Sequence, residues 1–238
     1  MIIFAKNNIM GKDKQRRFDE MNTFENVYQN FDFKKPELIN YKNETVELKG
    51  KWAQNHFKNS NAITLELACG KGEYTVALSE KNKNKNYIGV DIKGARIHDG
   101  AKKCLAKKQD NAAFLRTRIE LLPQFFDKDE VSELWIVFSD PFPKDRHAKH
   151  RLTSPFFLDV YRKICKKDCI INVKTDSESL FDYTLEILEE QKIKPLILER
   201  NIYKTGYENE LLTGIQTFYE KQHIANGRKI NYVQFHLS

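Results

Sequence analysis

The 238-residue sequence lacks an apolar run long enough to span a membrane, and its amino terminus lacks the apolar segment of a signal peptide. Its four cysteines are scattered and form no C-x-x-C pair, so the sequence predicts neither a zinc site nor a disulfide framework. These absences together predict a soluble protein of the reducing cytoplasm, with free thiols, no bound metal and no membrane partner.

One loop contains glycines but lacks the features of the two commonest nucleotide-binding motifs. The segment Ala68-Cys69-Gly70-Lys71-Gly72 does not end in G-K-[ST], as a phosphate-binding loop does, and has two glycines where the dinucleotide fingerprint needs three. An apolar run typical of a buried strand, 63–67, precedes it, and a helical pattern follows it. Strand, glycine turn and helix open a doubly wound α/β fold, which binds ligands at the carboxyl ends of its strands.

Two carboxylates near this loop indicate an adenosine ligand. Asp91 ends the next predicted strand, where an acid is placed to accept hydrogen bonds from the two ribose hydroxyls. Glu66 lies inside the first strand, just before the loop. Because the loop has no phosphate-binding signature, an adenosine ligand without phosphates, S-adenosylmethionine, is the favoured interpretation. A βαβ turn that binds no ligand is the alternative.

Positive charge is informative where it clusters rather than in total. The net charge of +7 comes from 40 basic and 33 acidic side chains, which is weak support for an anionic partner. A local basic run, 144–151, follows Ser139-Asp140-Pro141-Phe142-Pro143, whose two prolines keep the backbone extended after a strand. This places Asp140 at the ligand-binding edge and predicts phosphate contacts for the run, with a solvated surface as the alternative.

Alternating strand and helix patterns predict an α/β fold with a doubly wound, mostly parallel, seven-stranded Rossmann-like sheet covered by helices on both faces. The predicted strands are 63–67, 87–91, 112–116, 134–139, 170–174, 195–199 and 231–237. The predicted helices are 51–57, 74–81, 95–107, 155–164, 180–191 and 212–225. Residues 1–50, with a basic cluster at Lys12, Lys14, Arg16 and Arg17, are predicted to extend a single domain at 51–238.

Four separated motifs resemble those of the bacterial tRNA (guanine-N7)-methyltransferases. The segment 65–72 resembles their cofactor loop, and 139–152 resembles their most specific signature. Lys174-Thr175-Asp176 matches the family's K-T-D, and Thr217-Phe218-Tyr219-Glu220 matches its T-x-Y-E. The string 205–208 also fits T-x-Y-E, but 217–220 is preferred because Gly227 and Ile230 follow it at the family's distance.

The resemblance implies a methyltransferase domain at 51–238 that moves a methyl group from S-adenosylmethionine to N7 of a guanosine in the tRNA variable loop (position 46). It implies that the cofactor-binding residues are Glu66, Gly70, Asp91, Glu120 and Asp140, with Asp140 also catalytic. It implies that the substrate-binding residues are Lys144, Arg146, Asp176, Thr217, Phe218, Tyr219 and Glu220.

The chain departs from the family pattern near the expected adenine site. Where the family usually has an aspartate after the third strand, this chain has Arg116-Thr117-Arg118-Ile119-Glu120, so Glu120 or a backbone group is expected to take that role. Ala68 replaces a usual glycine, and Phe142 replaces a usual tryptophan. His150 stands where a third basic residue is common.

The chemistry expected of this family needs little from the protein beyond positioning. Guanine N7 has an in-plane lone pair and no proton, so it attacks the methyl group without a general base, and alignment supplies most of the rate enhancement. Asp140 and Asp176 are the carboxylates expected to stabilise the positive charge that develops on the guanine.

Two other functions remain open at this point. One is a methyltransferase for another RNA, or for a protein or a small molecule; the last two would have less need of the basic run at 144–151. A non-catalytic RNA-binding module would have less need of Glu66, Gly70, Asp91 and Asp140. The expected partner is tRNA, and the sequence leaves open whether the protein is a monomer or a homodimer.

Overall fold

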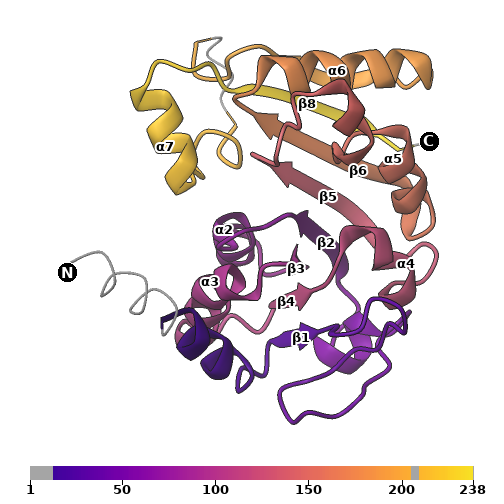
Figure 1. The fold of residues 1–238 in the computed structure, drawn as a ribbon, viewed down its shortest axis with the longest axis vertical. Coiled ribbons are helices and arrows are strands. Elements are labelled where there is room, and N and C mark those ends of the chain that lie inside the picture. The colour runs from indigo at the N-terminus through magenta and orange to yellow at the C-terminus, as the bar shows by residue number, and fades with distance from the viewer. Residues whose placement is uncertain (1–12, 205–208, 238) are drawn as a thin grey trace.

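The computed structural model describes residues 13–204 and 209–237. The string 205–208 and the basic residue Lys12 therefore lie outside the described residues. The strands are β1 (Val27–Gln29), β2 (Ala62–Leu67), β3 (Lys85–Asp91), β4 (Ala112–Arg116), β5 (Val131–Val137), β6 (Cys165–Thr175), β7 (Pro195–Glu199) and β8 (Asn231–His236). They form one sheet in the order β1-β4-β3-β2-β5-β6-β8-β7 (Figure 1). All neighbouring strands are parallel except β8, which runs antiparallel to β6 and β7.

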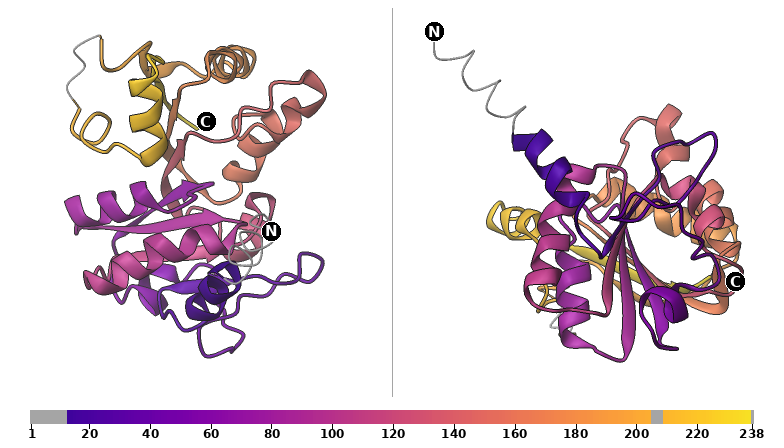
Figure 2. Two further views of the ribbon diagram at one scale, coloured as in Figure 1. Left: turned by 60° about the vertical axis from the view of Figure 1, so that its left-hand side comes forward. Right: turned by 90° about the horizontal axis from the view of Figure 1, so that it is seen from below.

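Helices cover both faces of this sheet. The helices are α2 (Glu73–Lys81), α3 (Gly94–Ala106), α4 (Leu122–Phe125), α5 (Pro155–Arg162), α6 (Glu178–Glu190) and α7 (Phe218–Ala225), with a further helix at 13–21. Short 3₁₀ or π segments lie at η1 (Trp52–His56), η2 (Ile119–Leu121) and η3 (Asp145–His150). One face carries α2, α3 and α7, and the other carries α5 and α6 (Figure 2). The apolar core divides accordingly, with one large cluster on the α5–α6 face and two smaller ones on the α2–α3–α7 face.

The sheet has eight strands rather than the predicted seven. The additional strand, β1, lies within the segment predicted as an extension and pairs in parallel with β4, with Val27 opposite Phe114. Buried side chains of the same segment, Met21 and Leu38 among them, join the core. The segment 13–50 is therefore an integral part of the packed fold.

Several predicted boundaries also move, for identifiable reasons. The helix predicted at 212–225 begins at Phe218, because Leu212 and Ile215 are buried as irregular chain and the cap is Thr217. The strand predicted at 134–139 ends at Val137, because Phe138 has a φ of +50°, which no strand accommodates. The helix predicted at 51–57 is a single π-type turn, η1.

The loop after β2 owes its shape to one aromatic ring. Gly72 has a φ of +65°, and a Cβ atom there would lie 2.4 Å from the ring of Phe114 in β4. Gly72 is therefore required by packing between α2 and the sheet. A Cβ atom on Gly70 would meet nothing within 4 Å, so the loop at Gly70 borders open space.

Within the described ranges, no helix combines the length and apolarity needed to cross a membrane. The same residues bring together no group of three His, Cys, Asp or Glu side chains that would hold a metal ion.

Candidate active site

The strand order reverses at β2, which has β3 on one side and β5 on the other. Ligands of doubly wound folds bind beside such a switch point, at the carboxyl ends of the strands. A cavity of about 290 Å³ lies there. Its lining includes Ala68 after β2, Asp91 at the end of β3 with Ile92, Lys93 and Arg96 after it, Thr117 to Glu120 after β4 and Phe138 to Asp140 after β5.

Asp91 joins two loops at the wall of this cavity. Its Oδ2 accepts a hydrogen bond from the Gly70 amide at 2.9 Å, and its Oδ1 accepts one from the Lys93 amide at 2.7 Å. Each carboxylate oxygen has two lone pairs, so each retains an acceptor site. Asp91 is therefore held in place by the protein and still fits the two neighbouring hydroxyls of a ribose, which supports the predicted cofactor site.

Asp140 and Glu120, the other predicted acids of the cavity, are exposed and line it. Among the residues that the structure describes, neither carboxylate has a hydrogen-bond donor or a cationic partner. The structure thus brings Asp91, Glu120 and Asp140 into one cavity. Neither Asp140 nor Glu120 forms an ion pair with a described residue, although Lys93, Arg96 and Arg118 line the same cavity.

Three residues of the cavity wall have left-handed backbone conformations, although none is a glycine. The φ angles are +54° at Ala68, +50° at Phe138 and +43° at Phe142. Such a conformation costs roughly 1–2 kcal/mol for a residue with a Cβ atom. Strained residues persist where the surrounding structure enforces them, and they concentrate at functional sites. Their gathering here is a signal that sequence reasoning missed.

Arg151 enforces part of that geometry, which corrects the expectation that it contacts phosphate. Its side chain is buried and donates hydrogen bonds to the carbonyls of Phe142, at 3.0 Å, and Pro141, at 3.2 Å. The guanidinium also lies 4.3 Å from the centre of the Tyr183 ring. Arg151 therefore stabilises the turn that follows Asp140 by binding its backbone carbonyls.

The remaining basic residues of the run face solvent. Lys144 and Arg146 are exposed on η3 or at its start, as is Lys149. They do not line the cavity, but His150 from the same turn does. The structure thus places the predicted substrate-binding residues Lys144 and Arg146 beside the cavity, where their charges are accessible.

Glu66 lies beneath the loop rather than in the cavity lining. Alternation along β2 directs Leu65 and Leu67 to one face of the sheet and Glu66 to the other. The Glu66 Oε2 accepts hydrogen bonds from the Thr75 amide at 2.7 Å and the Thr75 hydroxyl at 2.5 Å. Burial raises the pKa of Glu66 to about 7. Its contacts position the first turn of α2 and, with it, the loop.

Two of the sequence motifs meet in the interior. The Nζ of Lys174, from K-T-D, lies 2.6 Å from Oε1 of Glu220, from T-x-Y-E, and both side chains are fully buried. Tyr203 donates a hydrogen bond to the same oxygen at 2.7 Å, and Lys174 donates one to the Tyr74 hydroxyl at 2.8 Å. Burial lowers the pKa of Lys174, although the Glu220 carboxylate opposes that shift. Glu220 therefore anchors α7 to the sheet.

The other residues of T-x-Y-E divide between capping and exposure. The Thr217 hydroxyl accepts a hydrogen bond from the Glu220 amide at 3.1 Å and caps α7. Phe218 and Tyr219 are about half exposed. The Phe218 amide donates to Glu73 Oε1 at 3.1 Å, and the Lys71 ammonium lies 5.5 Å from the Phe218 ring. The glycine loop and α7 are thus in contact.

Asp176 lies after β6 and does not line the cavity. Its Oδ2 lies 2.6 Å from an Nη of Arg228 and 3.4 Å from Nδ1 of His223. The structure therefore does not bring Asp176 together with Asp140 as a second cavity carboxylate.

The chain matches a family model described as putative methyltransferase over residues 60–233. A tRNA (guanine-N(7)-)-methyltransferase of Christiangramia forsetii is 49% identical over 224 residues, which cover 94% of this chain and 97% of that protein. The enzyme of the same name from Bacteroides fragilis is 41% identical, over 95% of this chain and 86% of that protein.

The chain belongs to the bacterial tRNA (guanine-N7)-methyltransferase family. Solved structures of more distant methyltransferases share the fold. The 16S rRNA methyltransferase KamB superposes with a TM-score of 0.61 at 14% identity, over 82% of this chain and 96% of that one. In this tRNA (guanine-N7)-methyltransferase family member, the strand order and the antiparallel β8 are those of a Rossmann-like methyltransferase sheet with β1 added at its edge.

Proposed function

We propose that this chain transfers the methyl group of S-adenosylmethionine to N7 of a guanosine in the tRNA variable loop, at position 46, giving 7-methylguanosine. The observation that carries the proposal is the single cavity that holds both Asp91 and the unpaired Asp140, with the exposed cations of Lys144 and Arg146 beside it. Family membership supports the same reaction.

The donor and acceptor set of the cavity suits S-adenosylmethionine, which supplies an electrophilic methyl group when bound. Asp91 has one open acceptor site on each oxygen for the ribose hydroxyls. Glu120, after β4, lies in the cavity wall near the expected adenine position. Gly70 does not line the cavity and its amide is bonded to Asp91, but the open space beside it leaves room for the methionine end.

Asp140 is the residue to which we assign catalysis. The attacking guanine N7 has no proton to lose, so the protein has to align the base and compensate the positive charge that it acquires. A carboxylate at this point of the cavity wall stabilises such a charge more in the transition state than in the ground state. Alignment of two reactants contributes up to roughly 7–11 kcal/mol in favourable cases.

Substrate contacts are assigned to two surfaces that flank the cavity. Lys144 and Arg146 are placed to bind RNA phosphates, which position the substrate without selecting its sequence. Phe218 and Tyr219 offer exposed rings to an unstacked base, the usual mode of recognition in single-stranded RNA loops. Because Thr217, Glu220 and Asp176 bind groups within the protein, we assign them to positioning of these surfaces.

The decisive experiment incubates the protein with unmodified tRNA and labelled S-adenosylmethionine, digests the tRNA and maps the methylated nucleosides. We expect 7-methylguanosine at one variable-loop position, and no label in protein or metabolite pools treated in parallel. Label in those pools instead would indicate the alternative methyltransferase. Calorimetry that shows no binding of S-adenosylmethionine would indicate the non-catalytic RNA-binding module. The cytoplasmic location stays a prediction.

A further inference from the structure

A group of aromatic and cationic side chains gathers at the carboxyl end of β4, and all of its members except Arg118 lie outside the cavity lining. The Arg116 guanidinium lies between two rings, 5.1 Å from the centre of Phe18 and 5.4 Å from that of Phe31. The Arg118 guanidinium lies 4.6 Å from the centre of Phe33. These five residues form what is called here the phenylalanine–arginine surface.

The contacts that the structure gives for the two arginines of this surface are with aromatic rings and neutral acceptors. Arg116 donates to Gln29 Oε1 at 3.2 Å and to the Ile92 carbonyl at 3.4 Å, both neutral acceptors. In the described part of the chain, no carboxylate forms an ion pair with Arg116 or Arg118. A guanidinium has five N–H donors. Arg116, half-buried between two rings, therefore retains donors and charge for an external anion.

Phe31 is the exposed member of the surface. Its side chain is 55% exposed, the largest exposed fraction among the big apolar residues of the described chain. One side of its ring is occupied by Arg116, which leaves the other side accessible. An exposed aromatic ring stacked on a cation is a suitable platform for a nucleobase, since base and guanidinium favour ring faces alike.

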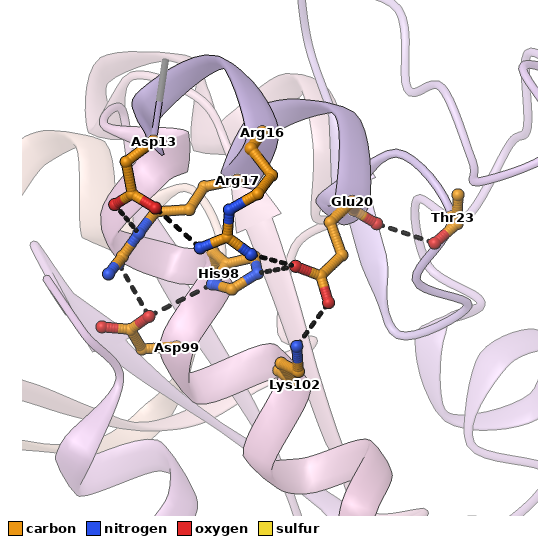
Figure 3. A network of polar contacts seen from close by, with 8 residues as sticks. All are labelled: Asp13, Arg16, Arg17, Glu20, Thr23, His98, Asp99 and Lys102. Atoms are coloured by element: carbon orange, nitrogen blue, oxygen red, sulfur yellow. Dashed lines mark hydrogen bonds and ion pairs between the residues drawn. The ribbon is translucent and has the colours of Figure 1, made fainter. Parts of the chain in front are cut away.

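Backbone pairing and ion pairs hold the Arg116 and Phe18 part of the surface in place. Gln29 of β1 pairs with Arg116, and the Asn30 amide donates to the Arg116 carbonyl at 2.9 Å. Phe18 lies on the helix at 13–21, which a network of ion pairs fastens to α3 (Figure 3). In that network Arg17 lies 2.8 Å from Asp99. Preorganisation of this kind lowers the entropic cost of binding.

The surface also adjoins the cavity. Thr117 and Arg118 line the cavity wall, whereas Arg116 and Phe31 lie just outside that lining. A substrate whose reacting base enters the cavity therefore brings its neighbouring nucleotides and phosphates within reach of the surface.

We propose that the phenylalanine–arginine surface binds the RNA substrate outside the cavity, with Arg116 on a phosphate and Phe31 stacked on an unpaired base. The assignment to RNA rests on the proposed function. It adds a contact region on the β1–β4 side of the cavity, opposite to the side that carries Lys144 and Arg146.

The test replaces the exposed ring and measures binding directly. Fluorescence anisotropy with a labelled, unmodified tRNA transcript gives the dissociation constant of wild type, Phe31→Ala and Phe31→Tyr. We expect Phe31→Ala to weaken binding by at least about fivefold, the low end for loss of one stacked base, and Phe31→Tyr to stay within about twofold of wild type. A matched control is Leu196→Ala, because Leu196 is 50% exposed on β7 at the other end of the sheet.

Two further measurements separate this proposal from others. Calorimetry should give the same affinity of Phe31→Ala and wild type for S-adenosylmethionine, and Arg116→Gln should lower the slope of log affinity against log salt by about 0.7 to 0.9. Equal tRNA affinities of wild type and Phe31→Ala would overturn the proposal, as would a wild type that binds no tRNA.

The two proposals fail separately in this design. If the wild type binds tRNA in a Phe31-dependent way but forms no 7-methylguanosine, the proposed function is refuted and the RNA-binding role of the phenylalanine–arginine surface is retained. A wild type that forms 7-methylguanosine with no contribution from Phe31 to tRNA binding would do the reverse.

Discussion

The two halves of the sheet's carboxyl edge use their carboxylates differently. After β3 and β5, Asp91 and Asp140 face a cavity and keep acceptor capacity for a ligand. After β6 and at the start of α7, Asp176 and Glu220 are already paired with cations of the protein. The carboxylates that the family resemblance assigned to binding thus divide into a set open to ligands and a set paired with cations of the protein. The first should govern binding and turnover, and the second stability.

The largest effect is expected from breaking the buried pair. Glu220→Ala leaves the ammonium of Lys174 buried without its counterion, which should lower the free energy of unfolding by roughly 3–5 kcal/mol. Urea denaturation measures this. The control is Glu37→Ala, which removes an exposed pair with Lys35 and should cost about 1 kcal/mol or less. A loss as small for Glu220→Ala as for the control would place Glu220 in the open set.

The contribution of Glu66 to stability should depend on pH. Its pKa of about 7 in the folded protein exceeds the value near 4.5 expected for the unfolded chain, so the folded state binds the proton more tightly. Protonation of Glu66 therefore contributes about 3 kcal/mol to the free energy of unfolding. This contribution is fully present below about pH 4.5 and is lost as the pH rises to about 7. Glu66→Gln should remove this loss.

The measurement is the difference in unfolding free energy between wild type and Glu66→Gln at pH 5 and pH 8. Taking the difference cancels other titrating groups such as His56, whose pKa is lowered to about 4 by burial. A difference that does not change between the two pH values would contradict the assignment.

Asp140→Asn tests the open set. The change keeps the size of the side chain but removes its charge, so we expect turnover to fall by about a hundredfold or more, as for loss of one preorganised electrostatic group. The free energy of unfolding should stay the same, since the carboxylate has no partner among the described residues. Single-turnover methylation at saturating tRNA and cofactor decides, and a rate within about threefold of wild type would show that Asp140 acts only as a turn residue.

Asp91→Ala should weaken cofactor binding more than tRNA binding. It removes charge-assisted acceptors for the ribose hydroxyls, worth roughly 1.5–3 kcal/mol, or about ten- to a hundredfold in affinity. Isothermal titration with S-adenosylmethionine measures the effect. Unchanged cofactor affinity would exclude Asp91 from the site.

The smallest effect distinguishes two cations of one basic run. Arg146→Ala should lower the salt slope of tRNA binding by about 0.7 to 0.9 and leave stability unchanged, because Arg146 is exposed. Arg151→Ala should destabilise the protein instead, since the carbonyls of Pro141 and Phe142 lose their donor. Equal salt slopes for Arg146→Ala and wild type would show that the run is only a solvated surface.

Sequence patterns were sufficient for the regular parts of the fold. The strands β2, β3, β4, β7 and β8 lie where periodicity predicted them, because alternating and buried runs of five or more residues leave a clear signal. The three-residue β1 left none, and its existence depends on the edge of β4. The predicted start of α7 was wrong, because the sequence pattern around the buried Leu212 is also that of a helical residue facing the core.

For the site, sequence identified residue types at strand ends but not the direction in which they face. Asp91, Glu120 and Asp140 share a cavity as predicted, since carboxyl ends of parallel strands meet at one edge. The inward orientation of Arg151 has no signature in the local sequence, because it depends on tertiary contacts. The same holds for the pair of Lys174 and Glu220, which are 46 residues apart in the chain. The left-handed Phe138 is another such case, because phenylalanine is not a residue that predicts such a turn.

The pairing of β1 with β4 has a consequence for synthesis on the ribosome. Val27 is opposite Phe114, so the first strand is made 87 residues before its partner. At roughly 5–20 residues per second, translation takes about 4 to 17 s to cover that distance. Throughout that interval Met21 and Val27, both buried in the finished protein, have no β4 to pack against. The nascent amino-terminal segment therefore lacks the surface that buries its apolar side chains until β4 has been made.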